Sequence, residues 1–219
     1  MAQKGYKGMG MEGPVAAWYA RNTNDERRHR QVAERLVGKI PAGGRVLEIA
    51  PGPGYFAIEL SKLGHFEITG LDISQSFVEI ARRNASRAGA SIDFRLGNAS
   101  AMPFPDQSFD FAFCQAAFKN FSEPVKAIAE MHRVLRPQGQ AVIIDLRRDA
   151  SVAEIDHYVT TSGMGGFSQL FTKWTFRSML LKRAYTLPQM EAFVRQTPFH
   201  SCRIETDDIG FTLWLTRQE

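Results

Sequence analysis

The sequence lacks the features that would assign it to several specialised classes of protein. Two cysteines, Cys114 and Cys202, are too few for a disulfide framework. The five histidines show no metal-ligand spacing, so we expect no metal site. No run of about 18 apolar residues occurs, so we expect no transmembrane helix. Residues 1–6 contain no apolar signal core, which predicts a cytoplasmic location.

Neither sign of charge dominates the sequence. It has 27 Lys and Arg against 23 Asp and Glu, a net charge of +4. The densest basic groups, residues 27–30 and 182–183, favour solvated helix faces over a nucleic-acid or acidic-lipid patch. A composition of 44% apolar residues is ordinary for a globular protein, and 219 residues suit one domain. We therefore expect residues 1–219 to form a single domain.

Two apolar runs, each ending near an acidic residue, are the most informative part of the sequence. The first, residues 46–49, contains Glu48 and leads into a turn that contains Gly52 and Gly54. The second ends at Asp72, 18 residues beyond Gly54. A strand, a glycine turn, a helix and a second strand with a terminal carboxylate form half of a nucleotide-binding α/β sheet. The pattern predicts a cofactor that contains a nucleoside.

The glycines alone do not say which cofactor this is. Gly52-x-Gly54-x-x-Ala57 also fits the dinucleotide fingerprint, so an NAD-type oxidoreductase stays an alternative. Glu48 would repel a pyrophosphate, but it suits a zwitterionic cofactor with an ammonium group and a sulfonium. A third motif follows at residues 97–110, with the sequence GNASAMPFPDQSFD.

These three motifs together resemble the class I S-adenosylmethionine-dependent methyltransferases, in particular the small-molecule branch that includes ubiquinone/menaquinone-biosynthesis-type enzymes. The resemblance covers roughly residues 45–146 and implies S-adenosyl-L-methionine as cofactor. It implies an α/β fold with a Rossmann-like, mostly parallel seven-stranded sheet and helices on both faces. A C-terminal antiparallel hairpin and a helical lid insertion complete the expected fold. One position departs from the family pattern, because Ala50 stands where the first glycine usually sits.

The periodicity of the sequence predicts alternating strands and helices, which favours a parallel sheet covered on both faces. The predicted helices span about residues 25–37, 55–63, 75–88, 124–135 and 188–196. The predicted strands span about residues 46–49, 66–71, 92–96, 109–115, 141–146, 201–207 and 210–217. Ser76 and Glu79 have the spacing of a capping box at the start of the third helix.

Two segments lie outside this core. Residues 1–24, rich in Gly, Met and aromatics, make a poor core helix and predict a mobile arm or lid. Residues 151–183 carry more Met and aromatic side chains than simple coverage requires, and predict a lid insertion of two helices. The predicted division is thus an arm at 1–24, a cofactor-binding core at 45–146 and a lid at 151–183.

The resemblance implies a set of cofactor-binding residues. Glu48 would face the methionine end of the cofactor, Asp72 would accept hydrogen bonds from the ribose hydroxyls, and Asn98 would accept one from the adenine amino group. Helix capping by Asp72 and a turn role for Asn98 stay open as alternatives. Tyr19 would either donate its hydroxyl to the cofactor carboxylate or anchor the arm. The remaining candidates are loop residues (Ala50, Gly52, Gly54), adenine neighbours (Ile73, Ala99) and a backbone contact to the cofactor (Gln115).

The acceptor site is expected between the two outlying segments, because ligand pockets are mostly apolar with few polar groups. Its candidate residues are Trp18, Lys119, Asn120, Phe167, Phe171 and Trp174. Lys119 could act as a base, although a solvated lysine is the more common role. The aromatics could instead anchor the lid or form a homodimer interface. No catalytic residue is named, because transfer from a sulfonium needs mainly alignment.

The sequence therefore predicts an S-adenosylmethionine-dependent methyltransferase that acts on a small, apolar or aromatic molecule. A nucleic-acid methyltransferase is an alternative, but neither a concentrated basic face nor an Asn/Asp-Pro-Pro-aromatic loop is present. An NAD-type oxidoreductase is a second alternative, but it would explain no role for Glu48. A non-catalytic cofactor-binding module is a third, but it would explain no role for the aromatic side chains of residues 151–183.

Overall fold

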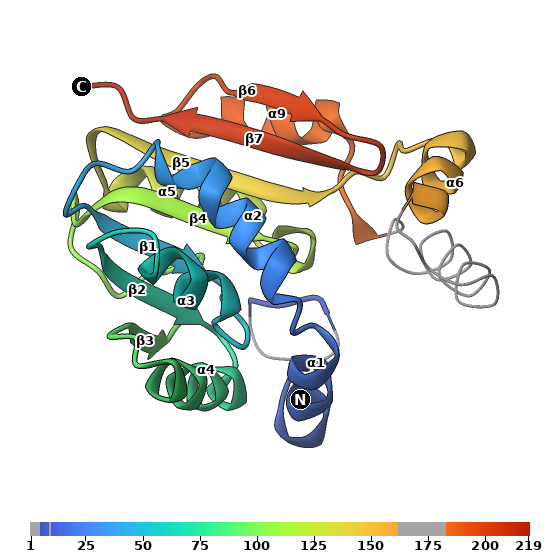
Figure 1. Cartoon of the computed structure of the whole chain (residues 1–219). Helices are drawn as coiled ribbons and strands as arrows, with labels where there is room; N and C mark the ends of the chain where they lie inside the picture. Colours follow the sequence, from blue (N-terminus) through green and yellow to red (C-terminus); the bar gives the residue numbers. More distant parts are fainter. Residues whose placement is uncertain (1–4, 9, 162–182) are drawn as a thin grey trace.

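A computed structural model describes residues 5–8, 10–161 and 183–219 of the chain. Among these residues, seven strands form one sheet in the order β3-β2-β1-β4-β5-β7-β6 (Figure 1). The strands are β1 (Arg45–Ile49), β2 (Glu67–Asp72), β3 (Asp93–Leu96), β4 (Phe109–Gln115), β5 (Leu135–Leu146), β6 (Arg203–Thr206) and β7 (Gly210–Thr216). The predicted Rossmann-like sheet is confirmed, and the strand boundaries agree with the prediction to within two residues except at the start of β5.

The pairing of the strands sets the position of the site. β1 pairs in parallel with β2 on one side and with β4 on the other, so the chain reverses its progress across the sheet between β1 and β4. Ligands of open α/β sheets bind outside the carboxyl ends of the strands at such a reversal. At the far edge, β7 pairs antiparallel with both β5 and β6, which confirms the predicted C-terminal hairpin.

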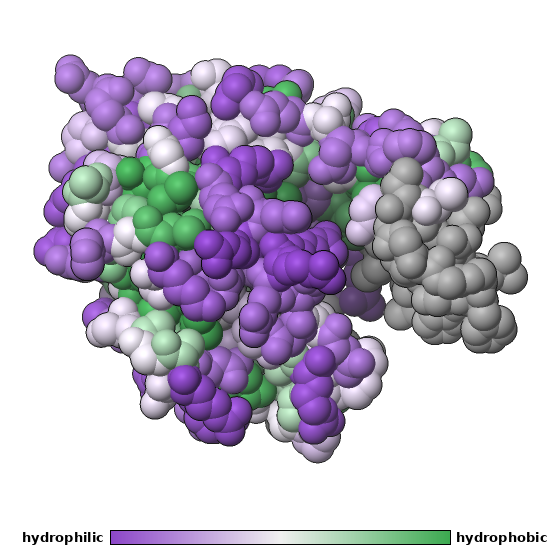
Figure 2. All heavy atoms as spheres, viewed as in Figure 1, coloured by the Kyte–Doolittle hydropathy of each residue, from purple (hydrophilic) through white to green (hydrophobic). Residues whose placement is uncertain are grey.

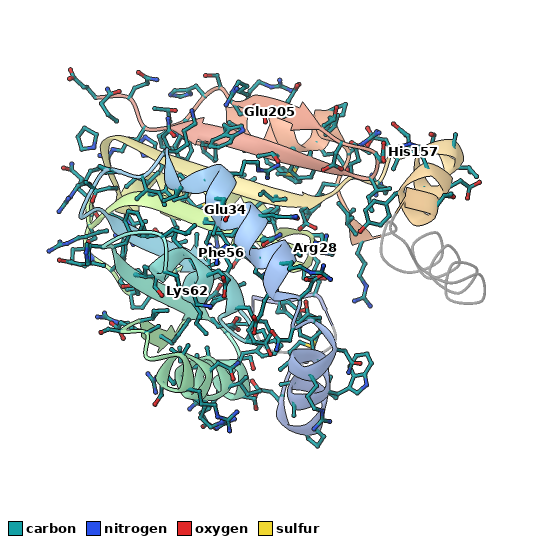
Figure 3. All side chains as sticks on the ribbon, viewed as in Figure 1. Arg28, Glu34, Phe56, Lys62, His157 and Glu205 are labelled. Carbon is teal, nitrogen blue, oxygen red and sulfur yellow. The ribbon has the colours of Figure 1, made fainter. Side chains whose placement is uncertain are left out.

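Helices cover both faces of the sheet, and alternate strand residues point to opposite faces. The helices are α1 (Gly13–Asn22), α2 (Glu26–Val37), α3 (Tyr55–Ser61), α4 (Gln75–Ala88), α5 (Pro124–Val134), α6 (Val152–Thr161) and α9 (Leu187–Arg195), with a short 3-10 helix η1 (Phe118–Asn120). Val46 and Phe113 pack with α2, α3 and α4, whereas Leu47 and Cys114 pack with α5 and α9. Phe56 of α3 stacks at a tilt on Phe113, with 4.1 Å between ring centroids (Figure 3).

The outer surface of the α2–α3 layer is mainly hydrophilic. Figure 2 shows this face with polar and charged residues over most of its area and smaller apolar patches between them. Arg28, Glu34 and Lys62, which Figure 3 labels, belong to this face and are carried by α2 and the end of α3. The apolar side chains of these helices point inward, which is the expected pattern for helices on a sheet.

The N-terminal segment differs from the prediction, which expected no stable helix before residue 25. Residues 13–22 form α1, with Pro14 in its first turn, where proline needs no hydrogen-bond partner for its nitrogen. Ala16 and Ala20 are buried, and the helix packs against α4. Packing against α4 stabilises this helix, and the composition of residues 1–24 does not reveal that tertiary contact.

Two smaller predictions were also wrong. The N-cap of α4 is Ser74, whose hydroxyl accepts a hydrogen bond from Phe77 N–H, and no capping box forms at Ser76. β5 begins at Leu135 rather than Ala141, because the expected turn at 136–139 continues as strand. The pairing between β4 and β5 shifts register between Phe109 and Phe111 to accommodate this extension. Of the predicted lid at 151–183, only α6 and Arg183 fall within the described residues, and the division of the chain into segments stays a prediction.

Candidate functional site

The ends of β1 and β4 have the same unusual backbone geometry. Ala50 follows β1 and Ala116 follows β4, and both have a φ of 56°. Each alanine donates its N–H to the neighbouring strand, Ala50 to Leu71 O and Ala116 to Ile144 O, both at 2.8 Å. A left-handed alanine costs about 1 kcal/mol or more relative to glycine. The chain thus turns sharply away from both strands at the reversal point of the sheet. Ligands of open α/β sheets bind at this point, and we call the expected ligand region between the two loops the cleft.

The two glycines of the loop after β1 have different roles. Gly52 has a φ of +55°, and a Cβ built on it would meet no atom within 4 Å. Gly54 has a φ of +80°, and its Cβ would lie 2.8 Å from Phe94 Cζ and 3.0 Å from Ala81 Cβ. Both glycines therefore have the left-handed backbone that favours glycine. Gly54 also lets α3 approach β3 and α4 closely, whereas Gly52 borders open space in which a ligand can lie against the backbone.

Asp72 ends β2 and holds the glycine loop in place. Its side chain is buried, with Oδ2 accepting from Gly52 N–H and Oδ1 from Ser74 N–H, both at 2.9 Å. Burial raises its pKa to about 6, and the two N–H donors oppose that rise. Each carboxylate oxygen has a second lone pair to offer. The residue therefore positions the loop and can still accept hydrogen bonds from a ribose; the ribose contact itself stays a prediction.

Glu48 is the most unusual residue of the site. It lies on the α2–α3–α4 face of β1 and is 4% exposed. Its Oε2 has no hydrogen-bond partner among the described residues, while the Ala57 N–H at the start of α3 donates to the carboxylate. Burial, with a contribution from Asp72, raises its pKa to about 8. A buried carboxyl oxygen without a partner costs free energy unless a cationic or hydrogen-bonding group meets it.

Residues 5–8 and 10–12, which we call the arm strand, run across the carboxyl ends of β4 and β2. Lys7 N–H donates to Asn120 O at 2.8 Å, and Ser122 N–H donates to Gly5 O at 3.1 Å. At the other end, the Ser74 hydroxyl donates to Met11 O. The backbone of Gly5 also passes close to Asn98, because a Cβ built on Gly5 would lie 2.6 Å from Nδ2. The arm strand therefore covers the position predicted for the cofactor.

Glu12 fastens the arm strand to α4. Its two carboxylate oxygens accept from Gln75 N–H at 3.1 Å and from Ser76 N–H at 3.0 Å. Gly13 N–H donates to the Ser76 hydroxyl at 2.9 Å. A carboxylate at the start of a helix is stabilised by the free N–H groups and by the helix dipole. Glu12 therefore takes part of the role that a capping box at Ser76 and Glu79 would have had.

Two tyrosines of the N-terminal segment face the acidic groups of the site. The hydroxyl pKa of Tyr6 is raised by burial and by the charge of Asp72. The hydroxyl pKa of Tyr19 is raised mainly by burial, with contributions from Asp145 and Asp72. The ring of Tyr19 packs edge-on against Phe77, with 5.6 Å between centroids. The contact of Tyr19 with the cofactor carboxylate stays a prediction, and Tyr6 is an aromatic that the sequence analysis missed.

The predicted adenine side is built by a tight turn. Asn98 Oδ1 accepts from Ser100 N–H at 2.9 Å, so the turn role of Asn98 is realised. Ala99 packs against the core on the α5–α9 face, and Ile73 lies between Asp72 and the N-cap Ser74. These residues flank the ends of β2 and β3, as expected, while their contacts with adenine stay predictions.

Lys119 is not the solvated lysine that the sequence favoured. Its side chain is 8% exposed, and its Nζ donates to Asp145 Oδ1 at 2.8 Å and to Ala116 O at 2.5 Å. Asp145 Oδ2 accepts from the backbone N–H of Lys119 at 2.9 Å. Gln115 ends β4, and Asn120 holds the arm strand through its carbonyl. These residues lie at the end of β4 and in η1, as expected, while their roles in binding cofactor or acceptor stay predictions.

The predicted aromatic walls are not brought together in the described part of the chain. Trp18 is 60% exposed on α1. Phe167, Phe171 and Trp174 lie outside the described residues. The acceptor role of all four stays a prediction.

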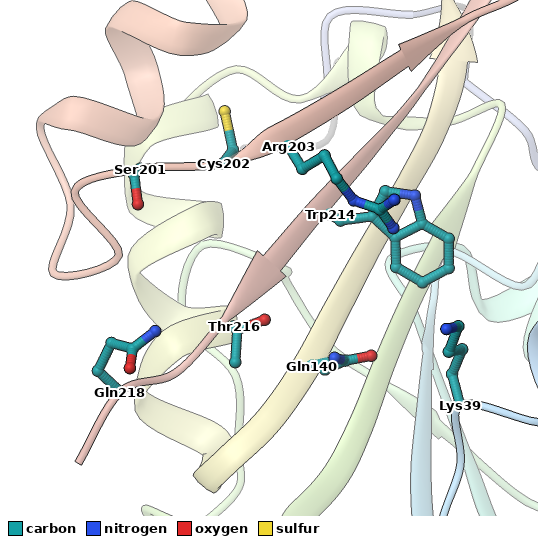
Figure 4. Close-up of a pocket in the computed structure, with 8 residues that line it drawn as sticks. All are labelled: Lys39, Gln140, Ser201, Cys202, Arg203, Trp214, Thr216 and Gln218. Atoms are coloured by element: carbon teal, nitrogen blue, oxygen red, sulfur yellow. The ribbon is translucent and has the colours of Figure 1, made fainter.

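A separate hollow of about 340 Å³ lies at the amino end of β5, at the opposite end of the sheet from the glycine loop (Figure 4). Arg203 stacks over the Trp214 ring there, 5.2 Å from its centroid. In the described residues no cluster of His, Cys, Asp or Glu could hold a metal ion. Over the same residues, no helix is both long enough and apolar enough to cross a membrane.

Comparison with known proteins decides the family. A family model described as a methyltransferase domain matches residues 47–143. A demethylmenaquinone methyltransferase from Renibacterium salmoninarum is 30% identical over 191 residues, which cover 86% of this chain and 71% of that protein. The chain belongs to the class I S-adenosylmethionine-dependent methyltransferases. The prediction of an S-adenosylmethionine-dependent methyltransferase is confirmed.

Two further similarities agree with this assignment. A demethylmenaquinone methyltransferase from Deinococcus radiodurans is 41% identical over 108 residues, which cover 49% of this chain and 45% of that protein. The crystal structure of an S-adenosylmethionine-dependent methyltransferase from Aquifex aeolicus has a TM-score of 0.68 at 18% identity. That alignment covers 91% of this chain and 97% of the other. At 18% identity, the similarity to the Aquifex aeolicus structure shows only that the two folds are alike.

The sequence analysis missed the residues that close the cleft of this methyltransferase: Tyr6, Lys7, Glu12, Asp145 and Tyr185. Only Asp145 gave a signal, as an acidic residue near the end of an apolar strand, like Glu48 and Asp72. The others belong to segments whose position depends on tertiary contacts.

Proposed function

We propose that this methyltransferase holds its cofactor across the carboxyl ends of β1 and β2 and transfers the methyl group to a small organic acceptor beside β4. The observation that carries this placement is the buried Glu48 carboxyl, whose Oε2 has no hydrogen-bond partner among the described residues, on the strand that leads into the open space at Gly52. The ammonium group of a zwitterionic ligand would favour the ionised form of this carboxyl and pair with it, whereas the pyrophosphate of a dinucleotide would oppose its ionisation and offer it no cation. S-adenosylmethionine supplies a methyl group that is already activated by a sulfonium.

The residues of the chain then have distinct roles. Glu48 takes the ammonium group, and Asp72 accepts from the ribose while it holds Gly52. Tyr6 and Tyr19 cover the ligand from the side of the arm strand, which excludes water from the cleft. Alignment and exclusion of water are the main contributions that methyl transfer requires from a protein.

The nature of the acceptor is the finer part of the proposal. The relatives from Renibacterium and Deinococcus are named as methyltransferases of demethylmenaquinone. This naming supports an acceptor with an apolar or aromatic body for the present chain. No feature of the described residues favours a nucleic-acid acceptor. The homodimer, which the sequence left open as an alternative, and the cytoplasmic location stay predictions, and light scattering on the purified protein tests the first.

A thermal-shift experiment tests the proposed site. S-adenosylhomocysteine should raise the melting temperature, whereas NAD and NADP should not, because Glu48 disfavours phosphate. Glu48→Gln should weaken the response to S-adenosylhomocysteine, and Glu67→Gln, an exposed control on β2, should leave it unchanged. Stabilisation by a dinucleotide without a response to S-adenosylhomocysteine would refute the proposal. Labelled cofactor with a chemically diverse acceptor panel then identifies the element that is methylated.

A further inference from the structure

A basic hollow of about 280 Å³ opens beside the ends of β4 and β5. It is lined by Lys7, Lys119, Arg148, Arg183, Ala184, Tyr185 and Gln189. These residues come from the arm strand, from η1, from the segment after β5, from the segment before α9 and from α9 itself. Segments that are far apart in sequence thus place four cationic side chains around one space.

The charge of this hollow is not neutralised from within. Lys119 is paired with Asp145, but the other three cations have no carboxylate within 4 Å among the described residues. Lys7 Nζ donates to the Tyr185 hydroxyl at 2.7 Å, and an Arg148 guanidinium N–H donates to Gln189 Oε1 at 2.9 Å. Both partners are neutral. The charge of Arg183 partly offsets the rise in the Tyr6 hydroxyl pKa, so Arg183 lies within electrostatic range of that hydroxyl.

The hollow borders the end of β4. Lys119 lines it and donates to the carbonyl of Ala116, the left-handed residue that follows β4. The Tyr185 ring forms an aromatic wall, which packs against Phe118 and Phe193. Asp145 and Ile143 share the α5–α9 face of the sheet, whereas Glu48 points to the other face. The hollow therefore lies at the end of β4, where the acceptor is proposed to bind, and on the opposite face of the sheet from Glu48.

We propose that this hollow binds an anionic group of the methyl acceptor, a carboxylate or a phosphate, through Lys7, Arg148 and Arg183. This inference rests on the proposed function and adds a charge to the apolar or aromatic acceptor body expected from the sequence. Guanidinium groups match carboxylate and phosphate oxygens with paired hydrogen bonds, and such charge-assisted bonds are stronger than neutral ones. The Tyr185 ring flanks the body of the acceptor, whose reactive atom then lies toward the end of β4.

The experiment uses simple aromatic probes on the full chain with saturating S-adenosylhomocysteine. Benzoate and phenyl phosphate carry the anion, and benzamide is the neutral match; calorimetry gives each dissociation constant. We expect the wild type to bind at least one anion more tightly than benzamide. Lys7→Gln and Arg148→Gln should each weaken anion binding about tenfold, the scale of one charge-assisted hydrogen bond. Arg195→Gln, an exposed arginine of α9 beside Glu191, is the matched control and should change nothing.

Each outcome decides a separate question. Equal affinity for benzoate, phenyl phosphate and benzamide, or anion binding unchanged in both variants, would overturn the inference and leave the methyltransferase proposal intact. Weaker S-adenosylhomocysteine binding in Arg148→Gln would also overturn the inference, because it would mean that the hollow holds the cofactor carboxylate and not the acceptor. Failure of the wild type to bind S-adenosylhomocysteine would instead refute the proposed function. A hydroxybenzoate that is methylated with a lower KM than its methyl ester, at similar kcat, would support the inference directly.

Discussion

Lys119 Nζ lies 2.8 Å from Asp145 Oδ1, and this ion pair is buried at the ends of β4 and β5. Asp145 also accepts hydrogen bonds from the backbone N–H groups of Lys119 and Leu146. The carboxylate thus fixes η1 on the end of β5. One buried pair connects the cleft between the strand ends with the basic hollow beside it.

Breaking this pair should destabilise the protein strongly. Lys119→Met leaves the Asp145 carboxylate buried without its counter-ion, and such changes cost about 3–5 kcal/mol. Urea denaturation measures the loss. Lys126→Met, which removes the exposed partner of Glu123, is the control and should cost less than about 1 kcal/mol. A loss for Lys119→Met as small as that of the control would mean that the pair contributes little.

The stability of the protein without cofactor should fall as the pH rises from about 5 to 8. Burial raises the pKa of Glu48 from 4.5 to about 8, so the folded form keeps a proton that the unfolded form has released. The free energy of unfolding then decreases with pH in that range. Glu48→Gln removes this titration, so its melting temperature should gain on the wild type between pH 5 and 8. Parallel curves of melting temperature against pH would contradict the raised pKa.

Asp72→Asn should reduce the affinity for S-adenosylhomocysteine at least tenfold. An amide nitrogen cannot accept hydrogen bonds from ribose hydroxyls or from Gly52 N–H, and each charge-assisted bond contributes about 1.5–3 kcal/mol. Calorimetry gives the dissociation constant, and circular dichroism checks the fold. Asp93→Asn on β3, whose side chain is exposed and paired with Arg95, is the matched control. An unchanged dissociation constant would mean that the ribose is held elsewhere.

Glu12→Ala should loosen the arm strand from α4. The change removes two hydrogen bonds to backbone N–H groups at the start of that helix, a loss of about 0.5–2 kcal/mol for a cap. Hydrogen exchange should become faster at Gln75 and Ser76 and in residues 5–8. Glu26→Ala, in the first turn of α2, should leave exchange in the arm strand unchanged. Unaltered protection of the arm strand in Glu12→Ala would show that Glu12 does not hold it.

The sequence predicted the parts of the fold that depend on local pattern. The bounds of α4, residues 75–88, and of β4, residues 109–115, were predicted correctly because apolar periodicity and flanking turn residues coincide there. The extension of β5 through Pro137 was missed, because proline and glycine normally indicate a turn. Residues 136–139 have no partner in β4, and the register of the β4–β5 pair shifts across them between Phe109 and Phe111. Helix α1 was missed for a similar reason, since its small buried residues gain stability from tertiary contacts, with α4 and with Tyr55 of α3.

The candidate site likewise contains residues that the sequence could identify and residues that it could not. Glu48, Gly52 and Asp72 could be found because they belong to one continuous strand–turn–helix–strand motif. The sequence left two roles open for Asn98, and the acceptance by its Oδ1 from Ser100 N–H realises the turn role, while the adenine contact stays a prediction. Tyr6, Lys7, Arg148 and Tyr185 meet only after the arm strand and the segment before α9 have packed around β4 and β5. No local sequence signal indicates that these four residues lie close together in the fold.

The position of β7 has a consequence for how the chain is made. β5 has β4 on one side and β7 on the other, and residues 147–209 must be synthesised before β7 can pair. Until then, residues 140–146 of β5 present unpaired N–H and C=O groups along an open edge with apolar side chains. Such an edge can pair with a strand of another chain. The ribosome-bound chain therefore passes through an interval of aggregation risk, which begins when β5 emerges and ends when residues 210–216 close the sheet.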